Sequence, residues 1–174
     1  MRNRIINEED YTRILKHAHP RYKPIFILLA ETGVRVDDIL KMRKWVLVKA
    51  LDTGVLALTE AKTGKYRSVQ LSDVALNVLR GLITPQKSSL SYVFPTLRRM
   101  HRMKRHRSTI TRQFTTAAER AGLGGKGYTV HSLRKLYARR LYNKTRSLLA
   151  VQRDLNHSNQ QTTLFYLLDI DLEP

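Results

Sequence analysis

The sequence predicts an α+β fold that is mainly α-helical and carries a small three-stranded antiparallel sheet. Helix caps and helical apolar spacing recur towards both ends of the chain, whereas three short segments rich in β-forming residues follow one another in between. The chain has 174 residues, of which 42% are hydrophobic. This length and this apolar content suit one globular domain with a core of its own.

The N-terminal region predicts three helices. Asn7 stands before three consecutive acidic residues, which is the pattern of a helix N-cap followed by an acidic first turn. Pro20 and Gly33 are expected to end the first and the second helix. The expected ranges are residues 7–18, 22–32 and 36–43.

Three short strands are predicted next, at residues 46–51, 55–59 and 66–71. Turn-forming residues around Gly54 and Gly64 separate them, so the strands are expected to pair antiparallel in sequence order. Ser72 then provides the N-cap of a helix that reaches about residue 81, and residues 83–91 are expected to form a loop.

The rest of the chain is predicted to be helical, with an interruption at the glycines between residues 122 and 127. Helices are expected at residues 109–121, 131–142, 148–155 and about 160–168. The run LRRMHRMKRHR at residues 97–107 is the most strongly charged stretch. It fits a solvated loop and a phosphate-contacting segment equally well.

The overall charge indicates an acidic partner. The chain has 32 lysines and arginines against 14 acidic residues, which gives a formal net charge of +18. Such an excess repels itself unless a polyanion is the working partner, and nucleic acid is the commonest one. A basic protein without an acidic partner is the alternative. A membrane surface is disfavoured, because we find no basic amphipathic helix with a bulky apolar face and no apolar run long enough to cross a bilayer.

Several kinds of site are disfavoured by what the sequence lacks. There is no cysteine, so disulfides and thiolate zinc sites are excluded. No carboxylate cluster or Walker loop indicates a metal or a nucleotide, and we expect no cofactor. The first ten residues have no apolar segment of the kind found in secretory signals, so we expect a cytoplasmic protein.

Two candidate groups for phosphate chemistry lie in the first half of the chain. Arg35 follows Thr32-Gly33-Val34 at the boundary of two helices, where a guanidinium and helix amides can face one phosphate. Asp38, three residues later, could hold Arg35 in its rotamer. Lys62, in the turn before the third strand, could deliver a proton, and Lys65 shares that turn. Alone, each signal also fits an ordinary surface ion pair or a solvated turn lysine.

Two further candidates lie in the second half. His131 and Arg134 are three residues apart, which places both on one helix face. His157 and Tyr166 are nine residues apart near the chain end. A polar helix cap and a packing tyrosine are the ordinary interpretations. Together, however, two arginines and one or two imidazoles can neutralise a pentacoordinate phosphorus, and a tyrosine hydroxyl can hold a phosphate covalently.

The order of these segments resembles the tyrosine recombinase (phage integrase) family over almost the whole chain. The matching motifs are TGVR ending at Arg35, AKTGK around Lys62, HSLR from His131 to Arg134, and LNHSNQQTTLFY ending at Tyr166. Each motif is loose by itself, but all of them in this order and at these intervals are highly specific.

The resemblance implies a site-specific DNA recombinase that cuts and rejoins strands through a 3′-phosphotyrosyl intermediate, without metal or ATP. Arg35 and Arg134 would clamp the scissile phosphate. His131 would accept the proton of the attacking tyrosine, and His157 would hydrogen-bond a non-bridging oxygen.

The remaining roles follow from the same resemblance. Tyr166 would be the nucleophile, Lys62 would protonate the leaving 5′-hydroxyl, with Lys65 as the alternative acid, and Asp38 would support Arg35. The implied partners are double-stranded DNA and other protomers in a tetrameric synapse, in a bacterial, archaeal or phage-infected cell. Further basic residues are candidates for DNA contact: Lys65, Arg67, Arg99, Arg102, Lys104, Arg105, Arg107 and Lys135.

Some features depart from the family pattern. Asn156 replaces the usual glycine before the last histidine, and asparagine tolerates left-handed backbone. Lys135 stands where a histidine is frequent. We expect residues 1–174 to form the catalytic domain, without the N-terminal core-binding domain that closes a clamp on DNA, as in a fragment or in a shorter member.

Two other functions use the same fold. A non-enzymatic DNA-binding module would be marked by loss of a clamp arginine or of the nucleophile, and neither is lost. A type IB topoisomerase would relax supercoils without a partner duplex, but the short chain and the motif spelling favour a recombinase.

Overall fold

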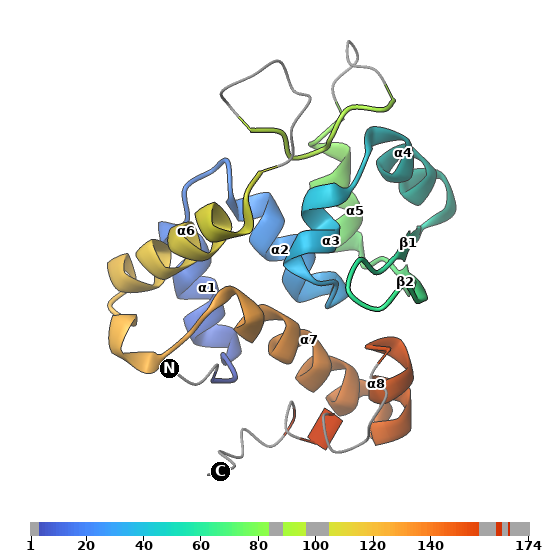
Figure 1. Ribbon diagram of the computed structural model, residues 1–174. Helices are drawn as coiled ribbons and strands as arrows, with labels where there is room; N and C mark the ends of the chain where they lie inside the picture. Colours follow the sequence, from blue (N-terminus) through green and yellow to red (C-terminus); the bar gives the residue numbers. More distant parts are fainter. Residues whose placement is uncertain (1–3, 84–88, 97–104, 157–162, 165–166, 168–174) are drawn as a thin grey trace.

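The computed structural model describes residues 4–83, 89–96, 105–156, 163–164 and 167. Within these residues the fold is mainly helical with a small antiparallel sheet, which confirms the predicted class (Figure 1). The elements are α1 (Glu8–His17), α2 (Lys23–Thr32), α3 (Val36–Lys41), α4 (Lys44–Thr53), β1 (Val55–Thr59), β2 (Tyr66–Gln70), α5 (Asp73–Arg80), α6 (Arg107–Arg120), a 3-10 turn at Gly124–Lys126, α7 (Val130–Thr145) and α8 (Leu148–Asp154).

Helix α2 forms the centre of the core. Its apolar side chains are buried almost completely, and it packs against α7 on one side and α5 on another. The ring of Phe26 meets Phe114 of α6 edge to face, with 5.2 Å between the ring centroids. Helix α1 packs on α6, so the helices enclose one apolar core. An all-round apolar helix such as α2 is stable only when neighbours cover it on every side.

The predicted helix caps are confirmed. The side chain of Asn7 accepts a hydrogen bond from the amide of Asp10 at 2.7 Å, and Ser72 caps α5 through the amide of Ala75. Helix α7 begins with a reciprocal capping box between Thr129 and Ser132. These bonds satisfy amides that the first helical turn leaves without partners.

The strand predicted at residues 46–51 is wrong, because this segment lies in helix α4. The described sheet therefore has two strands rather than three. Leu47 and Ala50 are buried at helical spacing, whereas Val48 is 48% exposed. Packing of α4 on β1 and α5 outweighs the β-propensity of its valines, and Gly54 in left-handed backbone ends the helix.

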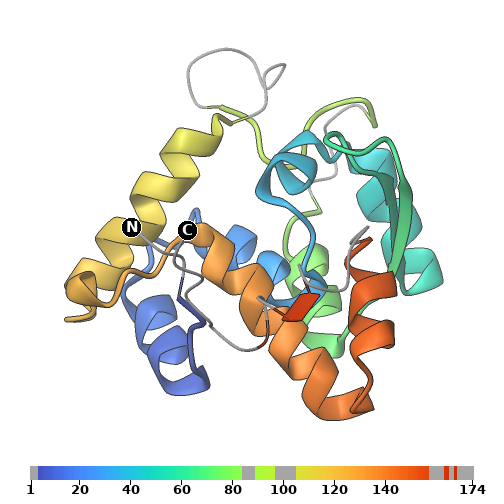
Figure 2. The same ribbon diagram turned by 60° about the horizontal axis from the view of Figure 1, so that its bottom comes forward.

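The two strands form a hairpin whose turn lies beside α3 (Figure 2). Leu56 pairs with Val69, and Leu58 pairs with Arg67. The turn closes through two backbone hydrogen bonds of 2.9 Å, from the Glu60 amide to the Lys65 carbonyl and from the Gly64 amide to the Glu60 carbonyl.

Helix α8 packs on α7 through a small separate cluster formed by Ala138, Val151 and Leu155. The helix predicted at about residues 160–168 lies largely outside the described residues. Among the described helices, none has the length and apolar character needed to span a membrane.

Candidate active site

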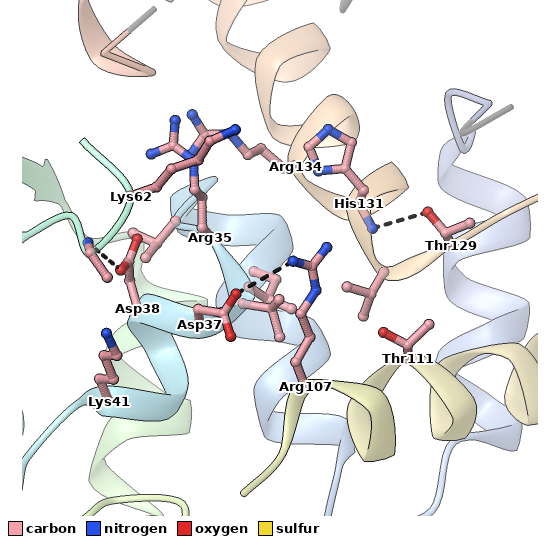
Figure 3. A pocket seen from close by; sticks show the side chains of 15 residues that line it. Arg35, Asp37, Asp38, Lys41, Lys62, Arg107, Thr111, Thr129, His131 and Arg134 are labelled. Carbon is pink, nitrogen blue, oxygen red and sulfur yellow. Dashed lines mark hydrogen bonds and ion pairs between the residues drawn. The ribbon is translucent and has the colours of Figure 1, made fainter. Parts of the chain in front are cut away.

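A cavity of about 730 Å³ lies where α3, α6, α7 and the β1–β2 turn meet (Figure 3). Four residues predicted from distant segments line it together, namely Arg35, Lys62, His131 and Arg134. Its lining carries five basic side chains, those of Arg35, Lys41, Lys62, Arg107 and Arg134, and two carboxylates, those of Asp37 and Asp38. The basic excess makes the cavity suitable for an anion.

Arg35 reaches the cavity because α2 ends one turn before it. Gly33 takes left-handed backbone at φ 58°, Val34 is buried, and Arg35 caps α3 in extended conformation. The chain thus reverses direction and presents the Arg35 side chain, which is 24% exposed, beside Lys62 (Figure 3).

His131 and Arg134 lie one turn apart on the cavity face of α7, as predicted. On its other face Leu133 and Leu136 are buried in the core. The Arg134 side chain is itself buried, and its guanidinium donates to the carbonyls of Gly33 and Leu155, the latter at 2.8 Å. These bonds fix the guanidinium plane while leaving it at the cavity wall.

The imidazole of His131 is neutral at physiological pH. Burial lowers the pKa of His131 to about 4, and the positive charges of Arg134, Lys135, Arg107 and Arg35 act in the same direction. A neutral ring keeps a lone pair that can accept a proton. An anion bound in the cavity would offset those charges and raise the pKa of His131.

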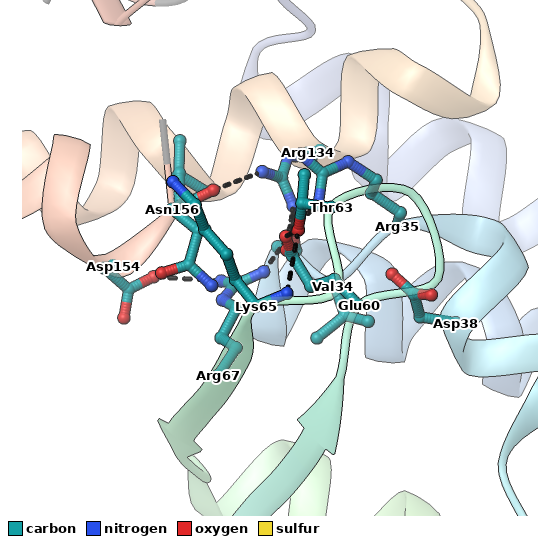
Figure 4. Close-up of polar contacts among 12 residues, drawn as sticks. Val34, Arg35, Asp38, Glu60, Thr63, Lys65, Arg67, Arg134, Asp154 and Asn156 are labelled. Atoms are coloured by element: carbon teal, nitrogen blue, oxygen red, sulfur yellow. Dashed lines mark hydrogen bonds and ion pairs between the residues drawn. The ribbon is translucent and has the colours of Figure 1, made fainter. Parts of the chain in front are cut away.

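Glu60 is a site residue that sequence reasoning missed. It is 1% exposed, and its carboxylate lies between the two arginines (Figure 4). Its Oε2 is 2.5 Å from Arg35 Nη1, and its Oε1 is 4.0 Å from Arg134 Nη1. Both guanidinium groups therefore lie within reach of one small anion. The signal that could have revealed Glu60 is strand alternation, since Leu56, Leu58 and Glu60 share one face.

Asp38 does not hold Arg35 through a hydrogen bond, so its predicted contact is wrong. Its Oδ1 instead accepts a hydrogen bond of 2.9 Å from the amide of Ala61, next to Lys62. Burial raises the pKa of Asp38, as does the charge of Glu60, while the Ala61 amide and Arg35 act against them. Asp38 thus anchors the turn, and Glu60 takes the role expected of Asp38.

The two turn lysines occupy different positions. Lys62 lines the cavity, and its ammonium points towards Arg35 and Arg134 (Figure 3). Lys65 is exposed and is absent from the residues that line the cavity. The placement favours Lys62 as the group that faces a bound phosphate.

Arg67 is misassigned as a candidate for DNA contact. It is 3% exposed and donates to the carbonyls of Gly33 and Thr32 at 2.9 and 2.7 Å. It also forms an ion pair of 2.9 Å with Asp154. The alternation of β2 places Arg67 on the inward face with Val69, which explains why it serves the fold.

The segment that leads to His157 is tied to the site at three consecutive residues (Figure 4). Asp154 pairs with Arg67, the Leu155 carbonyl accepts from Arg134, and the Asn156 amide group donates to the Tyr66 carbonyl at 3.1 Å. Asn156 has left-handed backbone at φ 54°, as its replacement of glycine led us to expect.

The other basic candidates differ in their placement. Arg107 is exposed, lines the cavity and lies 3.5 Å from Asp37. Arg105 instead anchors a loop, because its Nε donates to the Pro95 carbonyl and its guanidinium stacks over Tyr22. Lys135 adds charge near His131. The remaining predicted site residues, Arg99, Arg102, Lys104, His157 and Tyr166, lie outside the described residues.

Three of the four motifs that suggested the family, TGVR, AKTGK and HSLR, meet at this cavity. The model of the phage integrase family matches residues 4–171 of this sequence. The chain belongs to the phage integrase family. It is 26% identical to tyrosine recombinase XerD of Rhizobium meliloti over 174 residues, which covers 91% of this chain and 54% of that protein. The chain spans about half the length of the XerD and XerA relatives that it matches.

Solved structures share the fold. The crystal structure of XerA recombinase superposes with a TM-score of 0.79 at 23% identity, covering 95% of this chain and 58% of that one. A lambda integrase tetramer bound to a Holliday junction gives a TM-score of 0.74 at 24% identity, covering 96% of this chain and 48% of that one. These structural similarities show that the chain shares the fold of these proteins.

Proposed function

We propose that this chain is the catalytic domain of a site-specific DNA recombinase. The observation that carries the proposal is the convergence of Arg35, Lys62, His131 and Arg134 on one basic cavity from separate segments. The family membership and the recombinase relatives support it.

The reaction begins when a phosphodiester enters the cavity. Arg35 and Arg134 bind its non-bridging oxygens and stabilise the charge that grows on them as phosphorus becomes pentacoordinate. The hydroxyl oxygen of Tyr166 attacks phosphorus from the side opposite the leaving oxygen, and neutral His131 accepts its proton.

The bond from phosphorus to the 5′ oxygen then breaks. Lys62 supplies a proton to this oxygen, which leaves as a hydroxyl, and the 3′ end stays linked to Tyr166. A 5′-hydroxyl from a partner duplex reverses these steps and restores the phosphodiester. The phosphotyrosyl bond retains the energy of the original linkage, so strand joining requires no nucleotide.

The proposed partners are duplex DNA and further protomers. A lambda integrase relative forms a tetramer on a Holliday junction, and exchange between two duplexes requires four cleavage sites. A net charge of +18 favours a polyanion and makes binding weaken steeply as salt rises. Because the proposed substrate is chromosomal, phage or mobile-element DNA, we infer that the chain acts in the cytoplasm.

Covalent capture tests the proposal. The chain is incubated with a library of nicked duplexes of randomised sequence, in which a cleaved strand is lost by diffusion and the adduct persists. We expect DNA to remain attached to the denatured parent chain and to be absent from Tyr166→Phe, which still binds DNA. Capture that survives in Tyr166→Phe and disappears in Tyr142→Phe would overturn the assignment of the nucleophile.

A further inference from the structure

Glu60 is a buried carboxylate to which the reaction above gives no role. It opens a turn whose next five residues, 61–65, are exposed, yet its own side chain is 1% exposed. Burying a carboxylate costs free energy unless charged groups or hydrogen bonds compensate. The partners of its side chain, Arg35, Thr63 and Arg134, all belong to the cavity or to the turn that borders it.

One oxygen of Glu60 contacts both Arg35 and the turn that carries Lys62, the proposed acid. Arg35 and Arg134 together are called the phosphate clamp. Glu60 Oε2 lies 2.5 Å from Arg35 Nη1 and accepts a hydrogen bond of 2.8 Å from the Thr63 hydroxyl. Thr63 directly follows Lys62. The backbone of Glu60 also closes the turn through its bonds with Lys65 and Gly64.

The carboxylate of Glu60 is ionised in this setting. Burial acts to raise the pKa of Glu60, but the ion pair with Arg35, the hydrogen bond from Thr63 and the charge of Arg134 hold it below its usual value. The negative charge also offsets the repulsion between the two guanidinium groups that flank it.

We propose that Glu60 is a positioning residue that fixes the distance between Lys62 and the phosphate clamp. The inference rests on the recombinase function proposed above. Arg35 and Lys62 come from different elements, and transfer of a proton requires the ammonium to come within hydrogen-bond reach of the leaving oxygen of a phosphate held by Arg35. A misplacement of about 1 Å in such a site can cost on the order of 100-fold in rate.

Comparing the cleavage of two substrates distinguishes misplacement of Lys62 from loss of phosphate binding by the arginines. A nicked duplex obtained by the covalent capture is synthesised with either oxygen or sulfur at the 5′ leaving position, and single-turnover cleavage is measured. Thr63→Val keeps the size of the side chain but removes its hydroxyl, so we expect cleavage of the oxygen substrate to fall by roughly tenfold or more. The sulfur substrate should be cleaved within about twofold of the parent rate, because a thiolate leaves without a proton.

Glu60→Gln tests the carboxylate itself. The amide removes the charge beside Arg35 as well as the fixed turn, so we expect both substrates to slow, the oxygen substrate by roughly tenfold more than the sulfur one. Glu9→Gln and Thr59→Val make the same chemical changes at exposed residues that do not line the cavity, and these variants should cleave both substrates like the parent. Thermal melting verifies that all variants are folded.

The outcomes are distinct. Equal slowing of both substrates by Thr63→Val, or parent-like cleavage by both Thr63→Val and Glu60→Gln, would overturn the positioning role and leave the recombinase function intact. A parent chain that cleaves neither substrate would overturn the recombinase function, and the positioning role with it.

Discussion

Replacing Gly33 with alanine is expected to destabilise the fold and to disturb the arginine clamp at the same time. Gly33 ends α2 with φ 58°, in the left-handed region that residues with a Cβ rarely adopt. A Cβ at this position would lie 2.3 Å from Cδ1 of Tyr137, well inside van der Waals contact. The carbonyl of Gly33 also accepts hydrogen bonds from Arg67 and Arg134, so a shift of this residue moves both side chains.

The expected loss in the free energy of unfolding is the sum of two contributions. Left-handed backbone costs a residue with a Cβ about 1–2 kcal/mol. Forcing an extra methyl group into a packed region costs about 1–3 kcal/mol more, because the ring of Tyr137 must move. The sum is about 2–5 kcal/mol, which for a domain of this size lowers the melting temperature by roughly 4–20 °C.

Thermal and urea unfolding measure this loss, and Gly64→Ala provides the matched control. Gly64 has φ 67°, but nothing lies within 4 Å of a Cβ built there. Gly64→Ala should therefore show only the backbone cost of about 1–2 kcal/mol. In the Gly33→Ala background, Tyr137→Leu should recover part of the stability. If Gly33→Ala costs no more than Gly64→Ala, the close packing of Tyr137 on Gly33 is refuted.

Three further predictions follow from the contacts of the site. Lys62→Ala should slow cleavage of the oxygen substrate, and sulfur at the leaving position should restore the cleavage rate. If sulfur rescued Lys65→Ala alone, Lys65 rather than Lys62 would be the general acid. His131 has a pKa of about 4 in the folded chain and 6.5 ordinarily, so the unfolded state binds more protons between these values. The free energy of unfolding should therefore fall as pH drops from 6.5 to about 4, by at most about 3 kcal/mol, and His131→Gln should lack this component in urea titrations. Asp154→Asn removes the ionic partner of buried Arg67 and should cost about 1–3 kcal/mol in the same titrations, whereas an equal loss in Asp52→Asn, an exposed site, would speak against the ion pair.

Local signals predicted most of the fold. Asn7 and Ser72 begin helices because their side chains can bond an amide three residues away, and Gly33 ends one because it adopts left-handed backbone. The cap of α7 at Thr129 was not predicted. Helix α4 could not be predicted in this way, because its valines favour a strand and its helical form depends on β1 and α5 beneath it. A segment whose local preference opposes its final state is decided by tertiary packing.

The site residues show the same contrast between local sequence signals and tertiary packing. Arg35, His131 and Arg134 lie beside helix boundaries or at helical spacing, and all three line the cavity. Glu60 and Arg67 were missed or misassigned because a charged residue near a turn is usually solvated. Their burial depends on partners far away in sequence: Arg35 for Glu60, and Gly33 and Asp154 for Arg67.

The residue to which captured DNA is attached shows whether Tyr166 is the nucleophile. Trypsin releases residues 154–174 as one peptide after Arg153, and Tyr166 is its only tyrosine. Mass spectrometry of the captured complex, after digestion of the DNA, should find this peptide heavier by a nucleotide phosphate, and only in chains that retain Arg35 and Arg134. The same added mass on any other peptide, or on Arg35→Ala at the parent yield, would contradict the claim that these arginines prepare a phosphate for Tyr166.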